Sequence, residues 1–409
     1  MTAHPFPLSR RSVLLGAATG TAAALTGCGA PSGNSKIEES TVLAPTRPNK
    51  PVSLSILDVA GNLQLTQSMI DEYVRSEPQV ISKVTFSEGP SPELIGKIKA
   101  QQGAGRVDIH MVLTGVDGLA AGIEQGLWTR LLPTYADRLT GTGNYLEPAA
   151  KMQELAGNDG VVVTYYPSGP LLEYLPGKVA QPPDSARSLL AFAKARPGRV
   201  QYARPSNSGP GRTFLMGMPY VLGDKDPKDP EKGWSKTWEY LKELGRYIDY
   251  YPASTSETMK NLASGTAEVI VTTTGWDINP RVLGTVPAEA RISTLRGFVW
   301  VTDAHYVVVP KGVDSDQLSA VLNLLASMLT PQQQAKAYDD GYFYPGPAVK
   351  GVDLSMAPEK SRKALKEFGR PEYGQLITST RTQQPLDSKA LVKAFDLWDR
   401  EIGSGKVVS

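Results

Sequence analysis

The folded part of this chain opens with the stretch Val52-Ser53-Leu54-Ser55-Ile56-Leu57-Asp58-Val59-Ala60-Gly61-Asn62. Its first six residues favour a strand, and the polar residues that follow predict a turn. The next segment carries Leu65, Met69 and Tyr73 at a spacing of four residues, which is typical of one face of a helix. The order of strand, polar turn and helix predicts the first unit of an α/β fold.

The same order recurs along the rest of the chain. Further strands are predicted at residues 80–86, 107–113, 161–166, 200–202, 268–272 and 297–310, and helical patterns at 92–98, 185–195, 234–248, 258–263, 318–329 and 391–402. Strands that alternate with helices predict a parallel sheet covered on both faces, so the predicted fold class is α/β. The run at 297–310 suits a segment that crosses back to the first half of the molecule.

The N-terminal segment has the parts of an export signal. Arg10-Arg11 precede an apolar run, small residues follow it, and Cys28 is the single cysteine of the chain. The stretch Leu25-Thr26-Gly27-Cys28 resembles the lipobox of bacterial lipoproteins, which implies cleavage before Cys28 and a diacylglycerol on its sulfur. Residues 9–14 also resemble the twin-arginine export pattern, and an ordinary basic signal start is the alternative, so export by Tat or Sec stays open.

Length and composition bound the mature protein. Subtracting the signal (residues 1–27) from 409 residues leaves 382, more than one hydrophobic core usually serves, so we expect two domains. The apolar run of the signal is too short for a lasting membrane span. Residues 28–51 are rich in Pro, Ser, Thr and Asn, which predicts a flexible tether. We therefore expect an extracytoplasmic body held at the cell membrane by the lipid on Cys28.

Charge and residue usage exclude several classes. The chain has 43 Lys and Arg against 41 Asp and Glu, and removal of Arg10 and Arg11 with the signal balances the two. Nucleic acid as a partner therefore has no electrostatic support. Beyond the signal the histidines are His110 and His305, so zinc binding and Ser-His chemistry have few side chains to use. We expect no metal and no cofactor.

Three further stretches resemble one protein family. They are PELIGKIKA (92–100) with VDIHM (107–111), AKARPGR (193–199) with YARP (202–205), and TPQQQ (330–334). With the lipobox and the α/β order, they resemble the type II periplasmic substrate-binding proteins of ABC importers, among which the polyamine, thiamine and ferric-iron binders are nearest. The resemblance extends from about residue 50 to the C-terminus.

The resemblance implies a two-lobed fold with a ligand cleft between the lobes. Lobe 1 would contain residues 52–162 and 304–409, and lobe 2 residues 163–303, with crossing hinge segments near 163–166 and 273–303. Ligands of open α/β sheets bind beyond the carboxyl ends of strands, where loops 58–62, 113–115, 206–212 and 273–277 lie. The predicted ligand-binding residues are Asp58, Asn62, Thr114, Tyr165, Ser206, Asn207, Ser208, Gly211, Arg212, Thr274, Trp276, Asp277 and Asp303.

Loop 206–212 has the features of an anion site. Pro210 suits the first turn of a helix, so the N–H groups of Gly211 and Arg212 are expected to face the cleft with the positive end of the helix dipole. Such a site suits a carboxylate, a phosphate or another polar oxygen. The alternative is a plain capped helix whose amides bond to water or to Ser208.

Loop 273–277 has the features of a cation site. The indole of Trp276 beside the carboxylate of Asp277 can hold an ammonium group by cation–π attraction and a charge-assisted hydrogen bond. The alternative is a Trp276 packed in the hinge and an Asp277 that caps the next turn. The adjacent Tyr165 and Tyr166 resemble the ferric-binding members, but iron would also need His or carboxylate ligands.

The sequence thus predicts a receptor rather than an enzyme. It would act as a monomer that binds a small-molecule solute and delivers it to the permease subunits of an ABC importer. The favoured ligand is an organic amine, either a polyamine or a thiamine-like compound. Ferric iron, an anion or a phosphonate is the alternative ligand on the same fold. An exported lipid-anchored hydrolase is the alternative of another class, although the sequence has no Gly-x-Ser-x-Gly, His-Glu-x-x-His or Walker motif.

Overall fold

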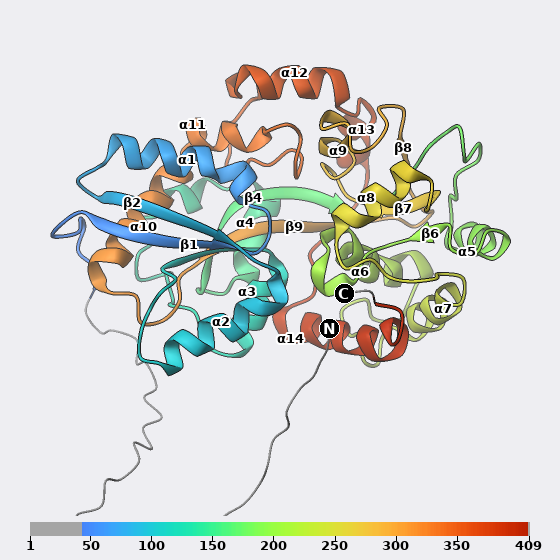
Figure 1. The fold of residues 1–409 in the computed structure, drawn as a ribbon, viewed down its shortest axis with the longest axis horizontal. Helices are drawn as coiled ribbons and strands as arrows, with labels where there is room; N and C mark the ends of the chain where they lie inside the picture. Colours follow the sequence, from blue (N-terminus) through green and yellow to red (C-terminus); the bar gives the residue numbers. More distant parts are fainter. Residues whose placement is uncertain (1–42, 408–409) are drawn as a thin grey trace, which may run out of the picture. The chain divides into compact units, whose positions relative to one another are not determined.

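The structure, a computed structural model, describes residues 43–407, whose strands form two sheets (Figure 1). The first sheet contains β1 (Val52–Asp58), β2 (Ile81–Glu88), β3 (Met111–Thr114), β4 (Gly160–Gly169), β9 (Trp300–Val308) and β10 (Thr382–Gln383). The second sheet contains β5 (Leu171–Tyr174), β6 (Val200–Gln201), β7 (Val269–Thr272) and β8 (Arg291–Ser293).

Both sheets are mixed rather than parallel. In the first sheet, β1 runs parallel to β2 and β3, while β9 runs antiparallel to β3 and β4. In the second sheet, β7 is parallel to β6 and antiparallel to β5, which also pairs antiparallel with β8. The α/β class is confirmed, but the prediction of a parallel sheet is wrong for these antiparallel pairs. The reason is that the chain reaches β9 from the second sheet, so β9 runs along β3 in the opposite direction.

The chain passes between the sheets at two places. Only Pro170 separates β4 from β5, and the pairing of β4 with β9 shifts between Tyr166 and Gly169. At this point Ser168 has φ of +72°, a conformation that is uncommon for residues other than glycine. The chain returns between β8 and β9, and Figure 1 shows β4 and β9 side by side, extending from the first sheet toward the second. The exact division into lobes stays a prediction.

The helices cover the sheets and follow most of the strands. They are α1 (Leu63–Ser76), α2 (Ser91–Gly103), α3 (Val116–Glu124), α4 (Glu147–Leu155), α5 (Ala186–Ala195), α6 (Gly209–Leu222), α7 (Ser235–Gly245), α8 (Thr255–Ser264), α9 (Asn279–Val282), α10 (Ser315–Met328), α11 (Pro331–Gln334), α12 (Glu359–Phe368), α13 (Glu372–Ser379) and α14 (Ser388–Trp398). Several begin at a residue whose side chain accepts a hydrogen bond from an amide of the first turn, which stabilises the helix start: Ser185, Ser208, Ser254, Asp314 and Asp387.

The third strand is shorter than the sequence predicts. The alternating pattern suggested a strand from residue 107, whereas β3 begins at Met111. The side-chain oxygen of Gln101 on α2 accepts hydrogen bonds from the backbone amides of Asp108 and Ile109. Because a side chain satisfies these amides, they do not need a neighbouring strand.

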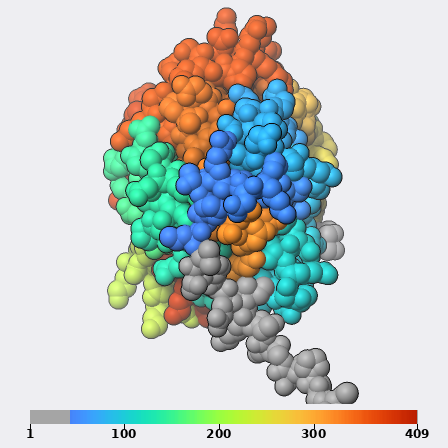
Figure 2. Space-filling model, turned by 90° about the vertical axis from the view of Figure 1, so that its left-hand side faces the viewer, coloured from blue at the N-terminus to red at the C-terminus, as the bar shows by residue number. Residues whose placement is uncertain are grey.

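The core joins segments that are far apart in the chain. All nine residues of β9 are buried, and α10 packs against both β1 and α1. Figure 2 shows the orange segment that contains α10 beside the blue segment that follows residue 42. Full burial of one large apolar side chain contributes about 1.5–3 kcal/mol, so these long-range contacts account for much of the stability.

The body begins earlier in the chain than the predicted boundary at residue 51. The Arg138 guanidinium donates to the backbone oxygens of Ala44, Pro45 and Thr46, and Asn49 donates to Asp316. The predicted tether, residues 28–51, therefore ends earlier than expected, because these bonds attach residues 44–49 to the body. The predicted signal, Cys28 and residues 28–42 of the tether lie outside the described residues. Among residues 43–407, none of the helices has the length and apolar character needed to cross a membrane.

Candidate functional site

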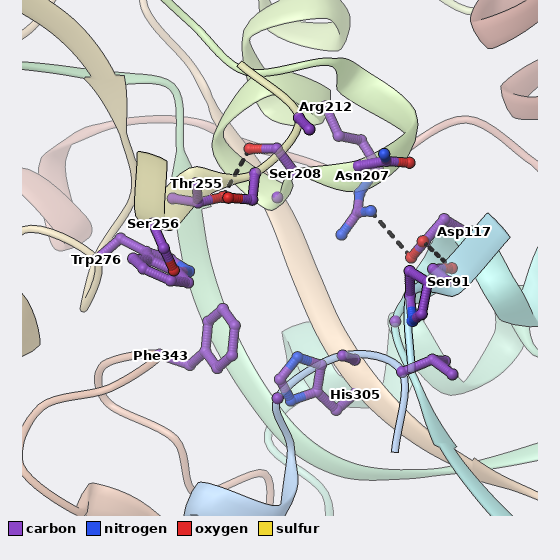
Figure 3. Close-up of a pocket in the computed structure, with 18 of the residues that line it drawn as sticks. Ser91, Asp117, Asn207, Ser208, Arg212, Thr255, Ser256, Trp276, His305 and Phe343 are labelled. Atoms are coloured by element: carbon purple, nitrogen blue, oxygen red, sulfur yellow. Dashed lines mark hydrogen bonds and ion pairs between the residues drawn. The ribbon is translucent and has the colours of Figure 1, made fainter. Parts of the chain in front are cut away.

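A pocket of ≈320 Å³ lies where the starts of several helices meet the crossing strands (Figure 3). Its volume is at the small end of the range for ligand pockets, which suits a small solute. The lining residues are Val59, Ala60, Gly61, Pro90, Ser91, Pro92, Gly115, Asp117, Tyr166, Asn207, Ser208, Gly209, Arg212, Ala253, Ser254, Thr255, Ser256, Trp276, His305, Tyr342 and Phe343.

Four helices, α2, α3, α6 and α8, begin at this pocket. The first amides of a helix have no acceptor within the helix, and the positive end of its dipole lies there. The Ser208 hydroxyl caps α6 by accepting from the Gly211 amide at 3.1 Å, and it lies 2.8 Å from the Thr255 hydroxyl at the start of α8. The helix starts therefore place hydroxyl and amide groups on one side of the pocket.

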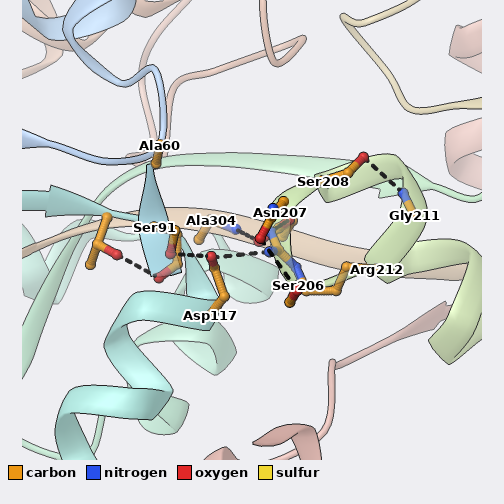
Figure 4. Close-up of polar contacts among 12 residues, drawn as sticks. Ala60, Ser91, Asp117, Ser206, Asn207, Ser208, Gly211, Arg212 and Ala304 are labelled. Atoms are coloured by element: carbon orange, nitrogen blue, oxygen red, sulfur yellow. Dashed lines mark hydrogen bonds and ion pairs between the residues drawn. The ribbon is translucent and has the colours of Figure 1, made fainter. Parts of the chain in front are cut away.

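The charged centre of the site is Arg212, which is 5% exposed to solvent. Its Nη1 donates to Asp117 Oδ1 at 3.0 Å and its Nη2 to Asp303 Oδ2 at 2.6 Å, so it connects α6 with α3 and β9 (Figure 4). Burial alone would lower the pKa of the guanidinium, but Asp303 and Asp117 outweigh burial and raise that pKa above its ordinary value. Arg212 is therefore a permanent cation.

Both carboxylates beside Arg212 have further donors. Ser91 Oγ donates to Asp117 Oδ2 at 2.5 Å. The Tyr166 hydroxyl donates to Asp303 Oδ2 at 3.0 Å, and the Ala304 amide donates to Asp303 Oδ1 at 2.9 Å. Two carboxylates thus face one guanidinium, which leaves one excess negative charge in this cluster.

An aromatic wall forms the opposite side of the pocket. Ring centroids lie 4.1 Å apart for Tyr342 and Phe343, 5.3 Å for Trp276 and Tyr342, and 4.6 Å for Tyr166 and Phe343. Gly275, with φ of +93°, allows this approach, because a Cβ there would lie 2.3 Å from the Phe343 backbone nitrogen. Figure 3 shows Trp276 and Phe343 on the side of the pocket away from Asp117.

His305 lies between the aromatic wall and the charged cluster and is 3% exposed. Its Nδ1 lies 2.8 Å from Asn62 Nδ2, and its ring meets Phe343 edge-on at 4.3 Å. Burial, followed by the charge of Arg212, lowers the pKa of His305 to about 3. The imidazole is therefore neutral at physiological pH.

The low pKa of His305 makes stability depend on pH. Between pH 3 and 6.5 the unfolded chain binds a proton at this histidine that the native chain does not, so the free energy of unfolding falls as the pH falls through this window. The loss amounts to ~1.4 kcal/mol per pH unit where the two states differ by a full proton. Chemical denaturation from pH 4 to 7 should show a flatter dependence for His305→Gln than for the natural chain. An identical slope in both proteins would contradict the prediction.

The structure brings only some of the predicted site residues to the pocket wall. Asn207, Ser208, Arg212 and Trp276 line it. Asn62 and Asp303 lie immediately behind, where they contact His305 and Arg212. Whether any of them contacts a solute stays a prediction.

Other predicted residues have local structural partners instead. Asp58 accepts hydrogen bonds from the amides of Ala60 and Leu63, and Ser206 donates to Asn207 Oδ1. Thr114 donates to the Gly115 oxygen, Thr274 accepts from the Ser168 amide, and the Tyr165 ring packs in the core. The predicted orientation of the Gly211 amide is wrong, because this amide bonds to the Ser208 hydroxyl, as in a plain capped helix.

The structure separates Asp277 from the pocket. Its Oδ2 accepts from Arg370 Nε at 2.7 Å and its Oδ1 from the Gly275 amide at 3.0 Å, and the residue is fully buried. Glu173 lies in the same cluster, 4.0 Å from Arg370, and burial followed by repulsion from Asp277 raises its pKa well above the ordinary value. The predicted pair of Trp276 and Asp277 facing one ammonium group is therefore wrong, since the turn directs the two side chains to different surroundings.

Several lining residues escaped the sequence analysis. Ser91, Asp117, Tyr342, Phe343 and residues 254–256 were not predicted. A signal existed for α8, because Ser254 and Glu257 have the spacing of a capping pair at a helix start. For the metal alternative, no group of three or more His, Cys, Asp or Glu within residues 43–407 is arranged to hold an ion.

The comparison with known proteins decides the family. The sequence model of one family, the bacterial extracellular solute-binding proteins, matches residues 69–366. The chain belongs to this family. The model of this family matches more than half of this chain.

Individual relatives of this solute-binding protein are distant. Protein YnjB of Escherichia coli (strain K12) is 27% identical over 201 residues, which are 46% of this chain and 49% of YnjB, so the chain spans about half the length of that relative. The periplasmic binding protein AfuA from Actinobacillus pleuropneumoniae, solved with fructose-6-phosphate bound, has a TM-score of 0.62 at 15% identity and covers 86% of this chain and 98% of its own. A periplasmic thiamin binding protein has a TM-score of 0.61 at 13% identity, with 89% and 100% covered. These likenesses confirm the two-lobed periplasmic binding fold.

Proposed function

We propose that this protein captures a small solute in the pocket between its two lobes and delivers it to the permease of an ABC importer. The observation that carries the proposal is the ≈320 Å³ pocket, which is lined from both sides of the crossing strands. Lobe 1 would be residues 52–162 with 304–409, and lobe 2 residues 163–303. Closure of the lobes on the solute would require tighter binding to the closed form.

The favoured ligand is an organic amine. The rings of Trp276 and Tyr342 offer π faces to a cation, and Asp117 and Asp303 outnumber Arg212 at the other side of the pocket. A cationic ring or an alkylammonium group of about this size would fit. The thiamin binder among the structural neighbours is compatible with this ligand class.

An anionic solute is the second candidate. The start of α8 favours a negatively charged oxygen, and Arg212 lines the same pocket. The bound fructose-6-phosphate of AfuA is a ligand of this kind. Ferric iron has less support, because Tyr166 already bonds to Asp303 and His305 to Asn62.

A thermal-shift screen of the soluble body tests the proposal. The panel contains polyamines, thiamine and its phosphates, amino acids, sugar phosphates, phosphonates and ferric iron. A ligand at ~100 times its Kd adds about 2.7 kcal/mol, which is a clear rise in Tm. No shift with any compound would count against a small-solute receptor.

Trp276→Ala is expected to weaken binding of an amine about tenfold or more, because it removes the largest ring of the aromatic wall. Trp238→Ala is the matched control, since Trp238 lies on α7 and is not among the lining residues. Isothermal titration calorimetry with a hit from the screen measures both variants. Equal affinity of the Trp276→Ala variant and the natural protein would show that the solute does not rest on this ring.

We propose further that the mature protein is a monomer anchored by a lipid on Cys28. The anchor rests on the stretch at residues 25–28 that resembles a lipobox. Cells grown with a labelled fatty acid should label the natural protein but not Cys28→Ser, and the variant should leave the membrane fraction. Retention of the label in Cys28→Ser would refute the anchor.

A further inference from the structure

Two side chains that line the pocket, His305 and Arg212, offer hydrogen-bond donors to a solute. The Nε2 atom of His305 has no hydrogen-bond partner among residues 43–407, and the amides of Thr255 and Ser256 are the first two of α8. Arg212, which also lines the pocket, adds the guanidinium nitrogens Nη1 and Nη2, each of which has a second N–H besides the one that it donates to Asp117 or Asp303. By contrast, each carboxylate oxygen of Asp117 already accepts a hydrogen bond, from Ser91 or from Arg212.

The hydrogen bonds of Asn62 assign the proton on His305. Asn62 is fully buried, its Oδ1 accepts from the Thr66 hydroxyl at 2.8 Å, and its Nδ2 faces His305 Nδ1 at 2.8 Å. An Nδ2 group can only donate, so Nδ1 of the neutral ring is the acceptor. The proton then lies on Nε2, and the ring offers an N–H donor to the pocket.

We propose that the solute is an amine that also carries a hydrogen-bond acceptor, such as a carboxylate, carbonyl or phosphate oxygen, and that this acceptor binds between His305 Nε2 and Arg212. The cationic part lies against the aromatic wall. A polyamine is the poorer ligand, because at neutral pH its polar groups are all donors and none of them can accept a hydrogen bond from His305 Nε2. This inference rests on the proposed function and selects one class of ligand among the organic amines.

The preference for an acceptor follows from the free-energy cost of burying a polar group without a hydrogen-bond partner. A buried donor without an acceptor loses its hydrogen bond to water and gains nothing in return. A site built to bond a polar group therefore rejects an analogue that lacks it more strongly than it rejects a change in apolar size. The Nε2 atom of His305 and the guanidinium of Arg212 are two such donor groups at the pocket.

The first test concerns the histidine alone and needs no ligand. Nitrogen-15 NMR of the mature protein reports the tautomer of each ring, and beyond the signal the histidines are His110 and His305. His110 is an internal reference, since its Nδ1 accepts from the Ser55 backbone amide at 2.8 Å. The expected result is an Nε2–H tautomer for His305, assigned by its loss in His305→Gln. An Nδ1–H tautomer would overturn the assignment and the inference.

The second test compares two solutes of equal length, 1,5-diaminopentane and 5-aminopentanoate. They differ only at one end, where a donor is replaced by an acceptor. Calorimetry should give an affinity about tenfold or more higher for the amino acid, the usual effect of one hydrogen bond. Asn62→Asp should reduce this preference, because a carboxylate accepts from Nδ1–H and leaves Nε2 as an acceptor. His305→Phe, which removes the donor without moving a charge, is the second variant should Asn62→Asp fail to fold.

The outcomes separate this inference from the proposed function. Equal binding, or tighter binding of the diamine, overturns the inference and leaves an amine receptor. Binding of neither compound, with no amine among the hits of the thermal-shift screen, rejects the organic amine itself and therefore both. A preference for the amino acid that persists unchanged in Asn62→Asp and in His305→Phe shows that another donor selects the solute, which also overturns the role of His305.

Discussion

Arg212→Gln is expected to abolish solute capture and to lower the free energy of unfolding by about 3–5 kcal/mol. The guanidinium is almost fully buried and faces the carboxylates of Asp117 and Asp303 at 3.0 and 2.6 Å. Without it, two carboxylates remain within a buried region with no cation between them. Because removal of one partner leaves uncompensated buried charge, the cost exceeds that of losing one hydrogen bond.

The measurement is denaturation by urea, combined with titration of a solute that binds the natural protein. Arg246→Gln is the matched control, because Arg246 pairs with Glu243 three residues away and its side chain is 73% exposed. Exposed pairs of this kind contribute about 0–1 kcal/mol, so the control should retain both stability and binding. An Arg212→Gln protein as stable as this control would mean that the buried cluster is not a stabilising ion network.

The second large effect is expected at Arg370, away from the pocket. Arg370→Gln should lower the free energy of unfolding by about 3–5 kcal/mol, because Asp277 would lose its bonded cation in a buried site. Asp277→Asn should cost less. Burial first, and then the charge of Asp277, raises the pKa of Glu173, so removal of that charge lowers this pKa and favours a pair of ionised Glu173 with Arg370.

The two substitutions also test where Asp277 acts. If it supports the fold rather than the solute, Asp277→Asn should retain solute affinity within a few-fold while the urea midpoint falls. Arg296→Gln is the control, since the Arg296 side chain is 78% exposed and its contact with Asp184 is on the surface. A loss of amine binding with unchanged stability in Asp277→Asn would restore this residue to the list of ligand contacts.

The order of elements could be predicted because its signals are local. The alternation in residues 52–57, the polar turn after it and the four-residue spacing from Leu65 appear in the structure as β1 and α1. The helix start at Pro210 was also correct, because a proline without an N–H and a preceding Ser208 act within one turn. The direction of β9 was not predictable, since it depends on a partner strand almost two hundred residues earlier.

The residues of the candidate site were harder to predict than the order of elements, because their contacts join distant segments. Trp276 and Asp277 are neighbours in sequence, yet one lines the pocket and the other bonds to Arg370, 93 residues away. Arg212 was correctly placed near the pocket, but its partner Asp117 is 95 residues distant and gave no signal. Phe343, which contacts Tyr166, His305 and Trp276, comes from a loop with no motif of its own.

The sequence by itself determined the α/β class, the family resemblance and the loops from which a site could be built, and it predicts the export signal. These follow from periodicity, capping and short motifs, which involve residues within a few turns of one another. Only the tertiary structure decided which polar groups meet, which of them are already paired, and which donors remain for a solute. The physical reason is that burial and charge pairing depend on distances in space between segments from different parts of the chain, and no local pattern records those distances.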